Sequence, residues 1–145
     1  MQSNAPCREA SGAVLLIEDE AMIRVLVRDL LELNGFRVLE AVSGEQALAL
    51  AGTPLPPLAF VITDHTMPGM DGCDTLAALR TLIPDLRAIL VSGFPLEDCL
   101  RGRTVPDCLF LAKPFTIAAF EGTVKALLET GSLPVLGGEP ATACP

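Results

Sequence analysis

The sequence predicts a doubly wound α/β fold, with a five-stranded parallel sheet and helices on both of its faces. Five short apolar runs, most of them continuous rather than alternating, are typical of strands that are buried on both faces. They alternate along the chain with segments in which apolar residues recur every three or four positions, as in amphipathic helices. This alternation predicts parallel strands joined by right-handed helical crossovers. The predicted strands are residues 13–17, 36–41, 58–63, 87–92 and 108–112.

The first two helices are predicted from periodicity and from their end signals. Apolar residues recur at helical spacing through residues 22–33, and Asn34 and Gly35 then form a common helix stop. Ser43 is expected to cap the next helix, with Gln46 three residues on in the capping-box position.

The later helices have weaker signals. One ends before Pro84, and Thr116 is expected to cap the last. Residues 95–104 are expected to be weakly helical at most, because Pro95 and Gly102 limit a helix there. The apolar residues expected to face the core are Met22, Ile23, Leu26, Leu30 and Leu33 in the first helix, Leu76, Leu79 and Leu82 in the third, and Ile117, Phe120, Val124, Leu127 and Leu128 in the last.

Composition limits the class of protein. The chain has 145 residues and 50% hydrophobic residues, with a mean hydropathy of +0.49, which predicts one folded domain rather than a disordered chain. No apolar run approaches the roughly 20 residues needed to cross a bilayer, so membrane insertion is not expected. The net charge of −8 argues against direct binding to nucleic acid.

The cysteines indicate reduced thiols and a cytoplasmic location. Their number is odd, and no C-x-x-C motif occurs, so neither a disulfide framework nor a zinc site is indicated. The five cysteines are Cys7, Cys73, Cys99, Cys108 and Cys144.

The two ends of the chain differ in composition from the rest. Residues 1–12 are polar and small and predict a flexible tail, in which Ser3, Asn4 and Ala5 resemble the scar left by tag cleavage. Residues 131–145 are rich in Gly and Pro, which predicts a flexible tail or linker. One domain is therefore expected over residues 13–130.

Complementary polar residues follow four of the predicted strands. Glu18 and Asp19 follow the first strand, Asp64 follows the third, Ser92 ends the fourth and Lys113 follows the fifth. Ligands of open parallel sheets bind at the carboxyl ends of the strands. Each residue alone has an ordinary explanation as a cap, turn or surface charge, but together they offer oxygen ligands for Mg²⁺, a nucleophilic aspartate and an ammonium for phosphate.

These residues lie in motifs that resemble the receiver domains of two-component response regulators. The matching pieces are VLLIEDE at residues 14–20, VITDHTMPGMDG at 61–72, LVSG at 90–93 and KPF at 113–115. They come in the family's order across residues 13–130. The resemblance implies the flavodoxin-like strand order 2-1-3-4-5.

The resemblance also implies a role for each site residue. Asp64 would accept the phosphoryl group and would also contact Mg²⁺. Asp19 would bind the ion directly, Glu18 would hold it weakly or through water, and the backbone carbonyl of Thr66 would be a further ligand. Lys113 would contact the phosphate, and the peptide bond between Lys113 and Pro114 is commonly cis in the family.

Ser92 and Phe110 occupy the family's switch positions. Ser92 is the hydroxyl that would turn toward the phosphate. Phe110 stands where Tyr is frequent, and it has no hydroxyl to hold at the surface. The resemblance therefore favours an inward ring, whereas the alternative reading makes Phe110 an ordinary core residue.

Three residues would border the phosphate. Thr66 would line the route of an attacking water, and Gly93 would leave the site open. His65, the only histidine, either modulates phosphate access and pH response or is an incidental loop residue.

The resemblance predicts a signalling module rather than an enzyme. Such a module would catalyse only its own phosphorylation and its own slow dephosphorylation. A histidine kinase or a histidine phosphotransfer protein would be the donor. A downstream protein would bind the face formed by residues 95–104, the fifth strand and the last helix, and a homodimer is also compatible. The chain would be either a stand-alone regulator or the receiver of a hybrid histidine kinase.

Two other functions stay open on the sequence. One is a phosphatase with Asp64 as nucleophile, although Thr66 stands where such an enzyme would need a general acid. The other is an interaction module on the same fold that works without phosphate.

Overall fold

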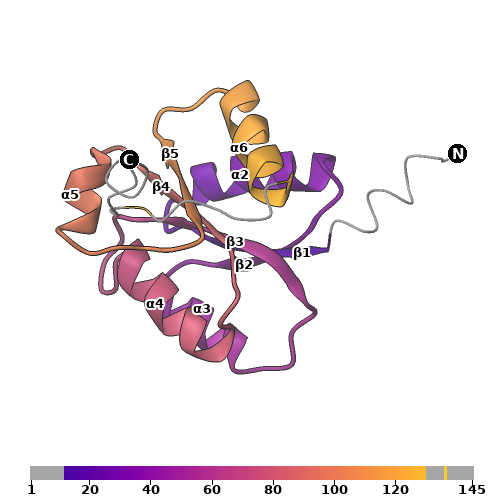
Figure 1. Cartoon of the computed structure of the whole chain (residues 1–145). Helices are drawn as coiled ribbons and strands as arrows, with labels where there is room; N and C mark the ends of the chain where they lie inside the picture. Colours follow the sequence, from indigo (N-terminus) through magenta and orange to yellow (C-terminus); the bar gives the residue numbers. More distant parts are fainter. Residues whose placement is uncertain (1–11, 130–135, 137–145) are drawn as a thin grey trace, which may run out of the picture.

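The computed structural model describes residues 12–129 and residue 136. Five parallel strands form one sheet in the order β2-β1-β3-β4-β5, which confirms the predicted fold class and strand order (Figure 1). The strands are β1 (Ala13–Ile17), β2 (Arg37–Ala41), β3 (Leu58–Asp64), β4 (Ala88–Ser92) and β5 (Cys108–Ala112).

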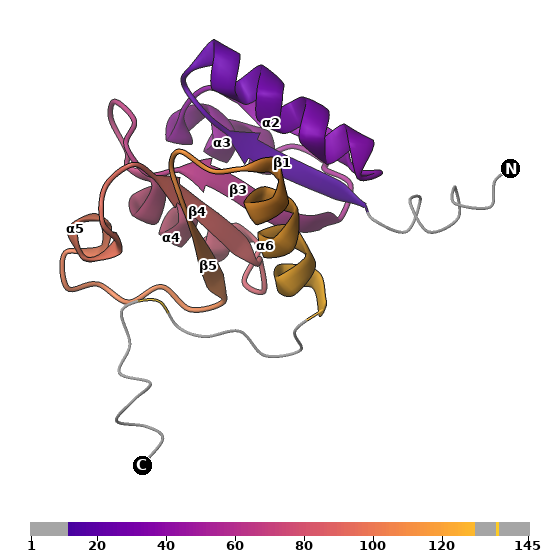
Figure 2. The ribbon, with the colours of Figure 1, turned by 90° about the horizontal axis from the view of Figure 1, so that it is seen from above.

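The helices form two layers around the sheet. They are α2 (Ala21–Leu33), α3 (Gly44–Ala51), α4 (Gly72–Leu82), α5 (Leu96–Leu100) and α6 (Ile117–Glu129). Helices α2 and α6 cover one face of the sheet and α3 and α4 cover the other (Figures 1 and 2). The segment expected to be weakly helical contains α5, which is only five residues long.

The sheet is buried from both sides, as the continuous apolar runs predict. All five residues of β1 and all five of β4 are buried. Successive side chains of a strand point to opposite faces. Leu16 and Phe60 accordingly join the apolar cluster under α2 and α6, whereas Leu15 and Val61 join the cluster under α3 and α4.

The predicted helix caps form. The Ser43 hydroxyl accepts a hydrogen bond from the Gln46 N–H at 3.0 Å, and the Gln46 side chain accepts one from the Val42 N–H at 2.6 Å. The Thr116 hydroxyl accepts from the Ala119 N–H at 2.9 Å. These bonds satisfy N–H groups that have no partner inside their own helices.

The buried face of α2 differs from the predicted one. Val27, Leu30 and Leu31 are buried, whereas Met22 is 86% exposed and Leu33 is 73% exposed. Helix α2 carries apolar residues on more than one side, so periodicity did not single out the stripe that packs on the sheet. Of the five predicted core residues of this helix, only Leu30 is fully buried, Ile23 is partly buried, and Leu26 is 49% exposed.

Smaller corrections apply to α4 and α6. Leu82 and Ile117 lie at helix ends and are 54% and 57% exposed. Leu128 is 45% exposed, because it follows the fully buried Leu127 and adjacent helical residues point in different directions. The remaining predicted positions, Leu76, Leu79, Phe120, Val124 and Leu127, are buried.

The ends of the predicted domain lie largely outside the described residues. Gly12 and Leu136 are the described members of the predicted tails 1–12 and 131–145. Leu136 forms an antiparallel bridge with Val105, in which each N–H donates to the other's carbonyl at 2.8 Å.

The thiols in the described part of the chain are buried. Cys73, Cys99 and Cys108 are free and lie in the core, and Cys7 and Cys144 fall outside the described residues. None of the helices in that part of the chain combines the length and apolar character needed to cross a membrane.

Truncation of Phe120 tests which face of α6 packs on the sheet. Phe120→Ala should lower the free energy of unfolding by about 3–5 kcal/mol, because it leaves a cavity at a fully buried position. Ile117→Ala on the exposed side should change it by less than about 1 kcal/mol. Urea denaturation of both variants measures the difference, and equal losses would contradict the observed helix orientation.

Candidate functional site

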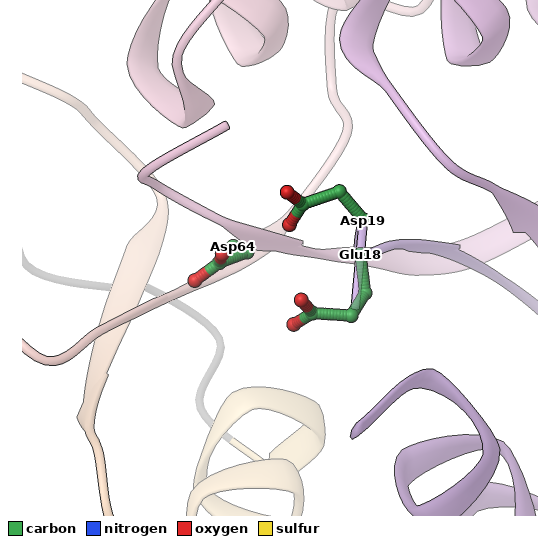
Figure 3. Close-up of side chains that lie close together, drawn as sticks. All are labelled: Glu18, Asp19 and Asp64. Carbon is green, nitrogen blue, oxygen red and sulfur yellow. The ribbon is translucent and has the colours of Figure 1, made fainter. Parts of the chain in front are cut away.

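Carboxylates converge at the carboxyl edge of the sheet. Glu18 and Asp19 directly follow β1, and Asp64 is the last residue of β3. Strands β1 and β3 are parallel neighbours, so their carboxyl ends meet. One oxygen from each residue lies within 4.8 Å of the others, and Figure 3 shows the three side chains grouped together.

Glu18 is held in place by its neighbours. Its N–H donates to the Ala41 carbonyl of β2 at 3.1 Å, and its own carbonyl accepts from the Arg24 side chain of α2 at 2.9 Å. The Glu20 N–H donates to the Glu18 carboxylate at 3.1 Å. Glu18 is buried, whereas Asp19 is exposed, so the pair offers one fixed carboxylate and one that faces solvent.

Lys113 supplies the positive charge of the site. Its ammonium lies 3.0 Å from the Asp64 carboxylate and 3.6 Å from the Glu18 carboxylate. The Lys113 N–H donates to the Ser92 carbonyl at 2.8 Å, which fixes the residue beside the end of β4. The peptide bond between Lys113 and Pro114 is cis, as the resemblance implies.

Burial and charge shift the pKa values of these groups. Burial raises the pKa of Glu18 to about 7, and the charge of Asp64 adds to the rise. Burial also raises the pKa of Asp64, although the hydrogen bond and the charge of Lys113 oppose it. Burial alone would lower the pKa of Lys113, but its hydrogen bond to Asp64 and the surrounding carboxylates outweigh this effect, so the pKa rises.

The donor set fits a magnesium ion. Glu18, Asp19 and Asp64 present carboxylate oxygens, the hard ligands that Mg²⁺ prefers, and one of them is open to solvent for the waters that the ion retains. Their negative charge exceeds the single positive charge of Lys113, which favours a cation. Thr66 lies two residues beyond Asp64 on the exposed loop that would add its carbonyl.

Ser92 and Gly93 lie where strand β4 ends, beside β3. Ser92 is buried, and its hydroxyl oxygen accepts a hydrogen bond from the Phe94 N–H at 3.0 Å. The hydroxyl hydrogen therefore remains available to a phosphate oxygen. Gly93 is exposed, so no side chain covers this edge.

Phe110 lies in the middle of β5 and points into the protein. It is half-buried and packs against the apolar cluster under α3 and α4. This packing agrees with both readings of the sequence, an inward switch ring and an ordinary core residue.

His65 follows β3 and is buried. Its N–H donates to the Val91 carbonyl at 2.8 Å, and its Nε2 lies 3.8 Å from the Asp71 carboxylate. Within residues 12–129, no group hydrogen-bonds its buried Nδ1. Burial lowers the pKa of His65 despite the nearby Asp71 carboxylate, which favours the neutral ring.

Gly72 allows helix α4 to begin directly against the backbone of Asp64 and His65. A Cβ at this position would lie 2.8 Å from the Asp64 carbonyl oxygen and 2.8 Å from the His65 Cα. The Gly72 N–H instead donates to the His65 carbonyl at 2.8 Å. Both atoms belong to backbone that cannot move aside, so only glycine fits this contact.

Two residues of the loop network beside the site, Asp71 and Arg103, have no role in the sequence analysis. Asp71 caps α4, accepting from the Asp74 N–H at 2.8 Å, and Arg103 pairs with Asp71 at 3.3 Å. Asp71 lies in the motif MPGMDG, directly before a predicted helix, and Asp is a common N-cap residue, so its capping role could have been predicted from the sequence. Arg103 lies near the end of the segment expected to be weakly helical, and no local pattern marks it. A cavity of about 310 Å³ beside this network is lined by His65, Thr66, Met67, Asp71, Phe94, Asp98, Cys99 and Arg101.

Comparison with known proteins agrees with this geometry. Residues 14–125 match the family model of the response regulator receiver domain. The chain belongs to the response regulator receiver family. The receiver is 38% identical over 121 residues to the sensor kinase CckA of Brucella abortus, a match that covers 82% of this chain and 13% of that kinase. The chain thus spans a small part of that relative.

Solved structures show the same fold. The receiver domain of a hybrid histidine kinase CckA is 32% identical, with a TM-score of 0.67, and the match covers 81% of this chain and 100% of that one. The response regulator TrrA of Thermotoga maritima, solved in complex with Mg²⁺ and BeF, is 26% identical with a TM-score of 0.66, over 81% of this chain and 99% of that one.

Removal of the buried Glu18 carboxyl should change how stability depends on pH in the metal-free receiver. Because the pKa of Glu18 is raised in the folded state, folding binds a proton between about pH 4.5 and pH 7, and stability falls as the pH rises through this window. Glu18→Gln should reduce that fall. Urea denaturation with a chelator measures it, and Glu32→Gln on the exposed side of α2 is the control. An unchanged pH slope in Glu18→Gln would contradict the raised pKa.

Proposed function

We propose that this receiver is a phosphoacceptor, in which Asp64 takes a phosphoryl group from a phosphohistidine of a histidine kinase or a histidine phosphotransfer protein. One observation carries the proposal. Asp64 lies at the open end of the sheet, 3.0 Å from the Lys113 ammonium and beside Glu18 and Asp19. A nucleophile, a phosphate-binding cation and oxygen ligands for a metal are thereby placed together.

In the proposed reaction an Asp64 carboxylate oxygen attacks the phosphorus. The new P–O bond forms as the P–N bond to the imidazole breaks, and the electron pair of that bond leaves with the ring nitrogen. The Lys113 ammonium offsets charge on the phosphoryl oxygens, and the Ser92 hydroxyl donates to one of them. Bound Mg²⁺, held by Glu18, Asp19 and Asp64, would supply further charge neutralisation.

The environment of Asp64 combines burial with one ammonium partner. Burial removes solvating water and raises the pKa of Asp64, and Lys113 opposes that rise. A carboxylate with few solvent hydrogen bonds and one ammonium partner is ready to attack. Water that later reaches the acyl phosphate past the exposed Thr66 would hydrolyse it slowly, so the receiver turns over only its own phosphate.

The phosphate would act through a partner-binding surface. The new negative charge at Asp64 would attract the Ser92 hydroxyl and shift the adjoining loops. This shift would change the surface formed by α5, β5 and α6. A downstream protein would read this face, and a second copy of the chain is a further partner. We place this exchange in the cytoplasm, either in a stand-alone regulator or in the receiver of a hybrid kinase such as the relative CckA.

Replacement of the acceptor tests the site. Asp64→Asn should abolish phosphorylation by acetyl phosphate with Mg²⁺, because an amide cannot form the acyl phosphate. Asp85→Asn is the matched control, since Asp85 is exposed and precedes β4 at the opposite edge of the sheet. Intact-mass spectrometry measures the added phosphate. Uptake by Asp64→Asn at the wild-type level would overturn the assignment.

The two lysines of the chain provide a second matched pair. Lys113→Gln should slow phosphorylation by roughly 100-fold, because it removes a preorganised charge from the transferred group. Lys125→Gln, on the exposed side of α6, should leave the rate unchanged. The time course of acetyl phosphate labelling measures both rates. Similar rates in the two variants would exclude Lys113 from the phosphate site.

A further inference from the structure

Arg103 joins the ends of two helices. It lies in the loop between α5 and β5, and its guanidinium donates to the Cys99 and Leu100 carbonyls at 3.0 Å each. These carbonyls lie in the last turn of α5, where helix carbonyls lack partners within the helix. The same guanidinium donates to Asp74 at 2.8 Å and to Asp71 at 3.3 Å, in the first turn and at the N-cap of α4.

This arrangement is favourable at both helix ends. A cation is stabilised at the carboxyl end of α5, and carboxylates are stabilised at the amino end of α4. The planar guanidinium reaches carbonyls on one side and carboxylates on the other without changing its own shape. Arg103 therefore links the carboxyl end of α5 to the amino end of α4.

The α4 end of this link leads directly to the proposed phosphoacceptor. Asp71 lies 3.8 Å from the His65 ring, and the Gly72 N–H is bonded to the His65 carbonyl at 2.8 Å. His65 is the residue after Asp64, and Gly72 leaves no free space against the Asp64 backbone. A shift of the backbone after Asp64 must therefore move the start of α4.

The aromatic residue at the family's switch position makes no hydrogen bond through its side chain. Phe110 has no hydroxyl, and its ring packs against the apolar cluster under α3 and α4. The α5 helix has only five residues, of which Cys99 and Leu100 are buried. The polar contacts at its carboxyl end therefore add to the packing of Cys99 and Leu100 in the core.

We propose that Arg103 is a positioning residue that transmits movement of the loop after Asp64 to α5, through Asp71 and Asp74. The proposal rests on the phosphoacceptor function. When the phosphoryl group adds charge at Asp64, the loop carrying His65 and Asp71 adjusts, and the guanidinium carries α5 with it. Arg103 thereby couples the site to one edge of the partner-binding face.

A spectroscopic comparison of two adjacent arginines tests the relay. Amide chemical shifts of the ¹⁵N-labelled chain are recorded with and without Mg²⁺ and BeF₃⁻, which mimics the phosphoryl group. In the wild type, shifts should change both near the site, at Thr66 and Met67, and in α5 (Leu96–Leu100). In Arg103→Gln the site response should persist, while the α5 response falls to less than about half.

Arg101→Gln is the matched control, because Arg101 is exposed at the C-cap of α5 and should leave both responses intact. Asp74→Asn weakens the shorter ion pair from the other side and should also reduce the α5 response. Adding it to Arg103→Gln should cause no further loss, because both act on one link.

The outcomes separate the two proposals. An α5 response in Arg103→Gln equal to that in Arg101→Gln would overturn the relay while leaving the phosphoacceptor function intact. A wild-type chain that shows no response at Thr66 and Met67 would contradict the phosphoacceptor function itself, and with it the relay. A general loss of folding in Arg103→Gln would show as collapsed spectral dispersion. In that case Asp74→Asn tests the relay, and an undiminished α5 response in this variant would overturn it.

Discussion

The contact between Asp64 and Lys113 is the interaction on which the site depends. Two buried carboxylates, Glu18 and Asp64, share one ammonium, which lies 3.0 Å from Asp64 and 3.6 Å from Glu18. Desolvation works against both negative charges, and without the ammonium they would repel each other in a poorly solvated pocket. Lys113 thus opposes the rise in the pKa of Asp64 that burial causes, and the excess of carboxylates over ammonium groups suits a bound cation. In the proposed function, the reactivity of Asp64 and the affinity for a metal ion would both follow from this imbalance of charge.

The parallel sheet makes that contact possible. Its strands are buried on both faces, so polar groups are confined to the strand ends, and parallel connectivity brings all carboxyl ends to one edge. Asp64 ends β3, Ser92 ends β4 and Lys113 follows β5, in neighbouring positions of the sheet. The apolar core and the polar site are therefore two consequences of one arrangement, which also excludes bulky residues at close approaches such as Gly72.

This receiver departs from the commonest family pattern on the side where a signal would leave the site. A phenylalanine takes the aromatic position, and α5 is short. The ion pairs of Arg103 connect the loop after Asp64 with α5 and so provide a polar link where the aromatic one lacks its hydroxyl. Coupling by charged groups differs from coupling by ring packing, because it is directional and sensitive to the loss of a single donor.

The sequence by itself determined the fold class, the strand order through the family motifs, and the acidic, hydroxyl and lysine residues at the strand ends. These features are local in the sequence. A strand that is buried on both faces appears as a continuous apolar run, and the predicted site residues lie at or just after the ends of such runs. Tertiary structure alone decided which side of α2 is buried, since Val27 and Leu31 compete there with equally apolar Met22 and Leu33. It also decided the burial of His65 and the partners of Arg103, which lie 29 and 32 residues away in the chain. Such contacts depend on how separate elements pack against each other, which cannot be predicted from the hydrophobic periodicity of a single element.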